Sequence, residues 1–406
     1  MLYRRFEALD QLLTRYQPFW QCQPFHWRDN CWRESAPELA TFLDQLSPEQ
    51  VFELEADPTP LMALLTPWFP DLGSLSALCT LPLNSKVPEP VPEVLGNYIP
   101  GRKWQQLRHF AAALPGVRGP VLEWCAGKGH LGRLLGFQSK QSVLSLEWQS
   151  ELCDAGQRLA KRAKVVMDFV CADAFSAAAR NLITPEQHAV ALHACGALHM
   201  RLLEVASQQQ TRALSISPCC YHLIEGSNYQ PMSDAGKNSP LQLTTQDLRM
   251  TVQETVTAGQ RVRRLRQIEL TWRLGFDLLQ RDIRGVDEYL PVPNLQKSWL
   301  SGTFSDFVNW ALAAKGLALT DDMTAERVAR YEQAGAERLP VMARMELVRH
   351  LFRRPLELWL VLDRALFLQE QGYQVELSQF CARELTPRNI LIHAERASAA
   401  PDGVNV

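Results

Sequence analysis

The stretch that decides the fold is VLEWCAGKGHLG, residues 121–132 of a chain of 406. It begins with a short apolar run, continues into a loop with two glycines and ends where a helical pattern begins. Glycines permit a tight turn and let a ligand approach the backbone, while the start of the helix offers unpaired amide donors. This order predicts one unit of a parallel sheet, with a ligand site at the end of its strand.

From residue 119 onward, short apolar runs alternate with helical stretches, which is typical of a parallel sheet. Five strands are predicted before residue 222, at Val121–Trp124, Val143–Glu147, Val165–Cys171, Ala189–His193 and Ala213–Ser217. After a long helical stretch, a helix over 355–371 and strands at Gln374–Phe380 and Asn389–Ala394 follow. The sequence therefore predicts an α/β fold: a Rossmann-like, doubly wound sheet of seven strands, interrupted once by a helical insertion after strand five.

The remaining segments predict the domain organisation. Residues 1–85 read as short helices broken by prolines and carry more acidic than basic side chains, so we expect an N-terminal acidic helical domain with a surface for a protein partner. The proline-rich stretch that follows predicts a linker at 86–101. The other predicted segments are the core at 102–222, the insertion at 223–353, the completion of the core at 354–397 and a tail at 398–406.

Composition narrows the class of protein. The 42 basic and 44 acidic side chains nearly cancel, which argues against a chain coated with nucleic acid. No stretch approaches the roughly 18 uncharged apolar residues of a membrane span, so we expect no membrane partner. The ten cysteines are mostly scattered singly in apolar runs, which favours reduced thiols in a cytoplasmic protein.

Three acidic residues stand at three successive strand ends and predict a nucleoside site. Glu147 follows Gly127 by twenty residues, a spacing that suits a carboxylate accepting from both ribose hydroxyls. Asp173 is placed to accept from the exocyclic amine of adenine. Glu123 would repel a pyrophosphate but attract the ammonium of a methionine moiety, so the loop favours S-adenosylmethionine over NAD. The competing interpretation is that the glycines only turn the chain and the acids only cap helices.

The predicted cofactor-binding residues follow from these positions. Lys103 stands upstream of the first strand and is expected to reach the cofactor carboxylate. The full predicted set is Glu123, Cys125, Gly127, Gly129, Glu147, Asp173, Ala174 and Lys103.

Thiols and imidazoles gather after strands four and five, where ligands of an open parallel sheet bind. The segments read LHACG at 192–196 and PCCYH at 218–222. Imidazole titrates near neutral pH, so His222 and His193 are the candidate general bases for a hydroxyl acceptor, while Tyr221 is a candidate to stack on an acceptor base. The predicted catalytic set is His222, Cys219, Cys220, Tyr221, His193 and Cys195.

Together with EWCAGKGHL, these two motifs resemble the class I methyltransferase domain shared by glutathione S-transferase C-terminal-domain-containing protein and its relatives. More distantly, they are similar to tRNA acceptor-stem 2′-O-methyltransferases. The resemblance covers about residues 103–284 and the TPRN of 386–389, but not the first 85 residues. It implies S-adenosylmethionine as cofactor and favours RNA, including tRNA, as acceptor. Cys125 stands where the superfamily usually has its first glycine.

Other functions stay open. Cys219 or Cys220 is positioned to attack C6 of a pyrimidine, with Cys195 assisting release, as in 5-methylcytosine formation. A protein methyltransferase and a module that binds the cofactor without turnover are further alternatives. A zinc site of His193, Cys195, Cys219 and His222 is disfavoured because adjacent cysteines rarely chelate one ion, so we expect no metal.

One helical pattern offers separate support for RNA. Apolar residues recur at steps of three or four over 261–284 and predict an amphipathic helix. Opposite this stripe lie five arginines suited to tracking phosphates: Arg263, Arg266, Arg273, Arg281 and Arg284. The alternative is a solvated face that Asp277 partly neutralises.

Overall fold

The computed structural model describes residues 1–253, 260–319 and 324–396. The chain divides into two compact units. The first spans the ranges 1–14, 75–254 and 354–406, and the second spans 15–74 and 255–353. These units divide the chain differently from the predicted boundaries, because residues 1–14 belong with the sheet and residues 15–74 with the insertion. The predicted tail at 398–406 lies outside the described residues.

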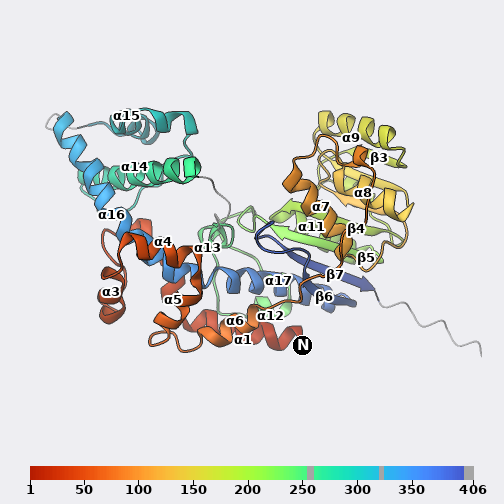
Figure 1. The fold of residues 1–406 in the computed structure, drawn as a ribbon, viewed down its shortest axis with the longest axis horizontal. Helices are drawn as coiled ribbons and strands as arrows, with labels where there is room; N and C mark the ends of the chain where they lie inside the picture. The colour runs from red at the N-terminus through yellow and green to blue at the C-terminus, as the bar shows by residue number, and fades with distance from the viewer. Residues whose placement is uncertain (254–259, 320–323, 397–406) are drawn as a thin grey trace, which may run out of the picture. The chain divides into compact units, whose positions relative to one another are not determined.

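A single seven-stranded sheet forms the centre of the first unit, as predicted (Figure 1). Its strands lie in the order β3-β2-β1-β4-β5-β7-β6. Strands β1 to β5 run parallel, whereas β7 is antiparallel to both β5 and β6. The strands are β1 (Val121–Trp124), β2 (Val143–Glu147), β3 (Met167–Cys171), β4 (His188–Cys195), β5 (Ala213–Cys219), β6 (Tyr373–Gln379) and β7 (Ile390–Arg396).

Helices cover the sheet because its strands are apolar on both faces. Leu107 and Phe110 of α7, Leu131 and Leu134 of α8 and Ala160 of α9 join one core cluster with the strands. Helix α11 contacts β4 and β5. The helices of this unit are α1 (Leu2–Arg15), α6 (Leu72–Cys79), η2 (Glu93–Leu95), α7 (Gly101–Ala113), α8 (His130–Ser139), α9 (Ser150–Ala163), α10 (Ala177–Arg180), α11 (Ala197–Gln208), α12 (Asp234–Lys237), α13 (Thr245–Met250) and α17 (Arg353–Glu370).

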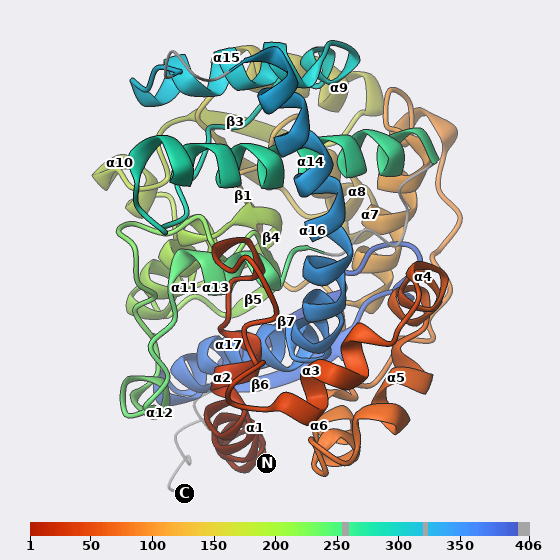
Figure 2. The ribbon, with the colours of Figure 1, turned by 90° about the vertical axis from the view of Figure 1, so that its left-hand side faces the viewer.

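The second unit is helical. Helices α14 and α16 cross in direct contact (Figure 2). The apolar stripe predicted over 261–284 is confirmed, since Trp272, Phe276 and Leu279 of α14 pack with Phe304 and Phe307 of α15. The helices here are α2 (Gln17–Trp20), η1 (Pro24–His26), α3 (Pro37–Asp44), α4 (Pro48–Ala56), α5 (Pro58–Leu65), α14 (Gln260–Arg284), η3 (Lys297–Ser301), α15 (Phe304–Lys315) and α16 (Ala325–Leu351).

The five-arginine face predicted on α14 is not free. The Arg281 side chain is 2% exposed and forms an ion pair with the buried Asp277, which also pairs with Arg338. Arg273 donates to the carbonyl oxygen of Val292, and Arg284 donates to a neighbouring glutamine. The buried Asp277 carboxylate keeps the guanidiniums of Arg281 and Arg338 turned inward, because an unpaired buried charge would destabilise the fold. Arg281 is therefore unsuited to tracking phosphates, and Arg273 and Arg284 already donate hydrogen bonds within the chain, while binding of RNA stays a prediction.

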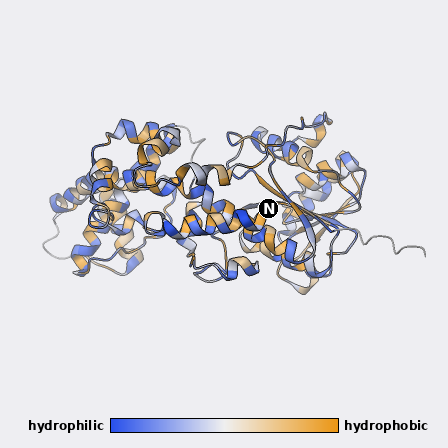
Figure 3. Ribbon diagram, turned by 90° about the horizontal axis from the view of Figure 1, so that it is seen from below, coloured by the Kyte–Doolittle hydropathy of each residue, from blue (hydrophilic) through white to orange (hydrophobic). Residues whose placement is uncertain are grey.

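Two observations bear on the expected compartment. The Sγ atoms of Cys22 and Cys31 lie next to each other as a candidate disulfide and the other eight cysteines are free, so the expectation of ten reduced thiols stays a prediction. Among the described residues, every helix falls short of the length and apolar character that a membrane span requires. Hydrophilic and hydrophobic residues interchange along the helices, as amphipathic helices require (Figure 3). The cytoplasmic location stays a prediction.

Candidate active site

The predicted site residues follow the carboxyl ends of β1 to β5. Because these five strands are parallel neighbours, their ends meet at one edge of the sheet. Strand order reverses between β1 and β4, and ligands of open α/β sheets bind at such a switch point. The topology therefore brings together the loop after β1, the acids after β2 and β3, and the thiols after β4 and β5.

The loop after β1 has a left-handed backbone at three positions. The φ angles are 55° at Cys125, 58° at Gly127 and 63° at Gly129. Cys125 thus adopts the conformation that a glycine would adopt more easily. A Cβ added at Gly127 would meet nothing within 4 Å, whereas one at Gly129 would lie 2.2 Å from Met167 Cε. Gly127 therefore leaves its backbone open to a ligand, while Gly129 packs against β3.

Glu147 holds this loop in place. Its side chain is buried, with 6% of the residue exposed. Its Oε2 accepts from the Gly127 amide at 2.8 Å, and its Oε1 accepts from the Gln149 amide at 3.1 Å. The carboxylate predicted to bind ribose is therefore next to the open backbone of Gly127. A charged acceptor fixed by two amides is preorganised for hydroxyl donors.

Asp173 and Ala174 lie just beyond β3. Asp173 is exposed, and its Oδ1 accepts from the Phe175 amide at 3.0 Å, while Ala174 is buried. Burial is the main reason why the pKa of the Cys125 thiol is raised to about 12. The negative charges of Glu147 and Asp173 act in the same direction, so both carboxylates lie near this thiol. The loop and the two acids after β2 and β3 thus share one neighbourhood.

Glu123 has a different setting from the one that its sequence position suggests. It is 5% exposed, and the Ser145 hydroxyl donates to its Oε2 at 3.0 Å. Amides of Leu131 and Gly132 in the first turn of α8 also hydrogen-bond to it. Burial raises the pKa of this carboxyl to about 7. Glu123 therefore anchors α8 to β1 and β2.

Three thiols converge after β4 and β5. Cys195 and Cys219 are register partners, and their Sγ atoms are 3.3 Å apart. The Sγ atoms of Cys195, Cys219 and Cys220 all lie within 4.8 Å of one another. Hydrogen bonds from the other two thiols lower the pKa of Cys220, and the nearby His222 and Arg388 act in the same direction. The hydrogen bond with Cys195 contributes most to raising the pKa of Cys219.

The backbone conformation and close packing after Cys195 require a glycine at position 196. Its φ is 55°, and an added Cβ would lie 2.0 Å from the carbonyl oxygen of Leu223. The Gly196 amide donates to the Cys219 carbonyl at 3.0 Å, and the Ala197 amide donates to that of Leu223 at 2.7 Å. This contact holds the end of β4 against the chain that leaves β5.

The two histidines differ in their settings. His193 is exposed at a break in β4 with a φ of 73°, and desolvation followed by the charge of Lys103 lowers its pKa. His222 is half-buried, and burial lowers its pKa. The Nδ1 atom of His222 has no hydrogen-bond partner in the part of the chain that the structure describes. The lowered pKa of both imidazoles favours the neutral form, which is the form that accepts a proton.

Tyr221 is not a surface for an acceptor. It is 0% exposed, its hydroxyl donates to Glu357 at 3.5 Å, and the guanidinium of Arg364 lies 5.2 Å from its ring centroid. The predicted stacking role is therefore wrong, because a fully buried ring has no face open to a base. Its position after two cysteines gave no sign of the side on which it packs.

Arg388 was missed as a candidate. It lies in the loop before β7, where its charge affects the pKa of both Cys220 and His193. The only signal in the sequence was the TPRN stretch at 386–389. Lys103, in the first turn of α7, is exposed and lies close enough to influence His193 and His130. The edge of the sheet therefore has two cations near its thiols and imidazoles.

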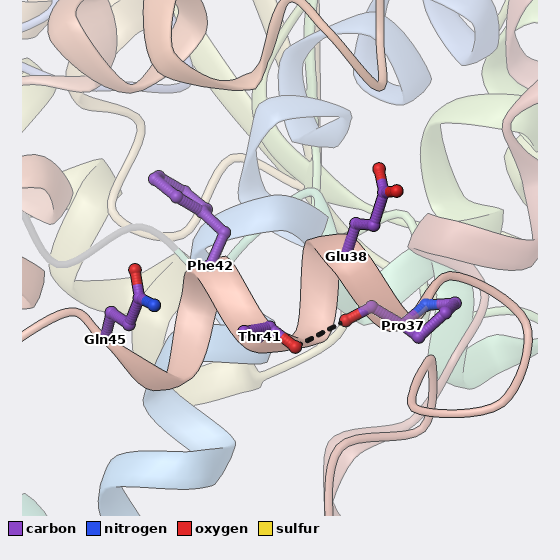
Figure 4. Close-up of a pocket in the computed structure, with 5 residues that line it drawn as sticks. All are labelled: Pro37, Glu38, Thr41, Phe42 and Gln45. Carbon is purple, nitrogen blue, oxygen red and sulfur yellow. Dashed lines mark hydrogen bonds between the residues drawn. The ribbon is translucent and has the colours of Figure 1, made fainter.

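A small hollow on the second unit is unrelated to these groups. It is lined by one stretch of α3 and its C-terminal neighbour: Pro37, Glu38, Thr41, Phe42 and Gln45 (Figure 4). Thr41 donates within the helix to the carbonyl oxygen of Pro37 at 2.8 Å. A hollow built from one helix brings no convergent polar groups, so we assign it no role.

Comparison with known proteins defines the class. Residues 102–227 match the family model of a methyltransferase domain. This segment includes the loop after β1 and the ends of β2 to β5. The match covers less than half of the chain and places a methyltransferase domain within the unit that contains the sheet. S-adenosylmethionine is the cofactor of this class.

No curated protein matches the chain. Among solved structures, YjhP from E. coli is similar at 15% identity and a TM-score of 0.25, over 31% of this chain and 55% of that one. TrmK of M. capricolum with S-adenosylhomocysteine is similar at 9% identity and a TM-score of 0.23, over 27% and 50%. The magnesium protoporphyrin IX methyltransferase of Synechocystis PCC 6803 is similar at 11% identity and a TM-score of 0.30, over 73% and 84%. The chain thus spans about half the length of the first two.

Proposed function

We propose that the protein transfers a methyl group from S-adenosylmethionine to an acceptor bound beside the ends of β4 and β5. The observation that carries this proposal is the pair formed by Glu147 and the open backbone of Gly127. These residues fit the cofactor: Glu147 for the ribose hydroxyls, Asp173 for the adenine amine, and the amides beyond Gly127 for the methionine end. Lys103 is proposed to meet the cofactor carboxylate.

The bound cofactor supplies an activated methyl group, so the protein has to hold an acceptor in line with it. For a hydroxyl acceptor, an imidazole would accept the hydroxyl proton. His222 is the proposed base because it follows the end of β5 and its ring is only half-buried, although its Nδ1 is enclosed. His193 is the second candidate.

RNA is the proposed acceptor. Its support is the resemblance of the LHACG and PCCYH motifs to tRNA 2′-O-methyltransferases. Arg263 and Arg266 remain the exposed members of the arginine set. The proposal that the acidic N-terminal helices bind a protein partner rests on sequence alone. A protein acceptor and a binding module without turnover remain alternatives.

A thiol nucleophile is the second chemical candidate. Cys220 is more exposed than Cys219 and has the lowered pKa, so it would be the cysteine that attacks C6 of a pyrimidine. Cys219 is buried and hydrogen-bonded to Cys195, which disfavours it as a nucleophile.

Calorimetric titration with S-adenosylmethionine and with S-adenosylhomocysteine tests the cofactor, and we expect both to bind. The absence of heat at millimolar ligand would refute the proposal. Mass spectrometry of nucleosides and proteins from cells with and without the gene then tests the acceptor. Loss of turnover in His222→Ala but not in Cys220→Ser supports a base, and the reverse supports the covalent route.

A further inference from the structure

The three thiols after β4 and β5 have no explanation in the methyl transfer proposed above. Cys195 ends β4, Cys219 ends β5, and Cys220 follows it. Two thiols would suffice for a disulfide, and one for a nucleophile. Three sulfur atoms within 4.8 Å of one another are instead close enough to be ligands of one ion.

We propose that Cys195, Cys219 and Cys220 bind one divalent ion of the zinc type. Zinc–sulfur bonds of about 2.3 Å in a tetrahedron place sulfur atoms roughly 3.8 Å apart. The observed 3.3 Å between the Sγ atoms of Cys195 and Cys219, and the 4.8 Å that bounds the whole set, lie on either side of this spacing. Small side-chain rotations would bring the three sulfurs to it.

The backbone removes the objection to two adjacent cysteines. Successive side chains of a strand point to opposite faces, so Cys219 and Cys220 would normally diverge. Cys220 has a φ of 45°, however, which ends the alternation and turns its Sγ to the side of Cys219. Left-handed backbone at a residue other than glycine is uncommon and costs energy.

Surrounding charge fits a metal bound by three thiolates. Coordination releases the three thiol protons to solvent and leaves a net charge of −1 on the complex. The guanidinium of Arg388 is close enough to Cys220 to offset this charge. Soft thiolate donors select zinc and related ions over magnesium or calcium. Three protein ligands leave the fourth tetrahedral position open, which is typical of zinc sites that bind water or a substrate atom.

Titration of the reduced full-length chain with Co²⁺ tests the site without using the cofactor or turnover. We expect a sulfur-to-cobalt charge-transfer band of the intensity of three thiolates, saturating at one ion per chain and displaced by Zn²⁺. Cys195→Ser, Cys219→Ser and Cys220→Ser should each weaken Zn²⁺ binding about 100-fold, since each removes a major share of the binding free energy. Cys171→Ser is the matched control, because this exposed free cysteine lies outside the set.

Several results would overturn the proposal. One is the absence of the band in the wild-type chain, which decides the matter even if a serine variant fails to fold. Another is a band that persists unchanged in all three folded variants. A third is a Cys195–Cys219 disulfide that survives reductant in peptide mass spectrometry. Because cofactor binding is not measured, failure here leaves the methyl transfer proposal standing.

Discussion

The two halves of the sheet edge carry different chemistry. After β1, β2 and β3 the chain offers the open space beside Gly127 and the carboxylates of Glu147 and Asp173. After β4 and β5 it offers thiols and imidazoles. Ionised carboxylates accept hydrogen bonds from hydroxyls and amines, whereas thiols and imidazoles bind soft metals and titrate closer to neutral pH. In the proposed function, the first half would hold the nucleoside and the second half would meet the reacting atoms.

Gly196 and Gly127, one glycine from each half, differ in how tightly they are packed, and this predicts the largest effect. Gly196→Ala should lower the free energy of unfolding by about 3 kcal/mol, because its Cβ overlaps a backbone oxygen and its φ is positive. Gly127→Ala, with the same sign of φ but open space around it, should lose only about 1 kcal/mol. Urea unfolding followed by circular dichroism measures both.

Cofactor affinity should show the opposite order. The Cβ of Gly127→Ala fills space assigned to the cofactor, so its affinity should fall more than that of Gly196→Ala measured below the unfolding transition. Equal losses of stability in the two variants would show that the close contact of Gly196 with the Leu223 carbonyl does not limit stability. Unchanged cofactor affinity in Gly127→Ala would place the cofactor elsewhere.

Glu147→Ala should have the next largest effect. It removes an acceptor for ribose hydroxyls and the bond to the Gly127 amide, so we expect about 100-fold weaker cofactor binding, or roughly 2.7 kcal/mol. Glu151→Ala, an exposed acid in the first turn of α9, is the control. In calorimetry, the cofactor affinity of Cys220→Ser should lie within a few-fold of the wild-type affinity. A comparable loss of cofactor affinity in Cys220→Ser would show that the thiols after β4 and β5 also take part in binding the cofactor.

The sequence predicted the first half better than the second. Two of its strands, Val121–Trp124 and Val143–Glu147, have the predicted bounds, because short apolar runs ended by a glycine loop or an acid leave little choice. The site at their ends follows from topology alone, since parallel neighbours end at one edge.

Long-range packing decided what the sequence missed. Tyr221 is buried by Glu357 and Arg364 of α17, more than 130 residues away along the chain, and no local pattern reports that contact. Cys220 and Cys219 come close together because Cys220 has a positive φ, and the neighbouring sequence does not predict that φ. Arg281 faces inward because Asp277 is buried, although helical periodicity put both on a polar face.

The buried carboxyl of Glu123 predicts a pH dependence for the first half. Its pKa of about 7 in the folded chain lies above its ordinary value of 4.5. The protonated form is thus favoured by folding, and stability is highest below pH 4.5 and falls as the pH rises toward 7. Between pH 5.5 and 7 the loss should be about 1.5 kcal/mol.

Glu123→Gln should remove this slope. Subtracting its unfolding curves from those of wild type cancels the other titrating groups, and Glu151→Gln controls for loss of a charge at an exposed site. Parallel pH profiles in wild type and Glu123→Gln would mean that the carboxylate is solvated in solution.

Lys103 should give the smallest effect, because it is an exposed cation acting on one end of the cofactor. Lys103→Ala should weaken S-adenosylmethionine binding about fivefold, or roughly 1 kcal/mol, and added salt should shrink the difference. Lys161→Ala, an exposed lysine in the last turn of α9, is the control. Methylthioadenosine lacks the amino-acid carboxylate, so its binding should not respond to Lys103→Ala. An equal loss for both ligands would assign Lys103 to the nucleoside or to the fold of α7 and would leave the methionine end of the site without its proposed cation.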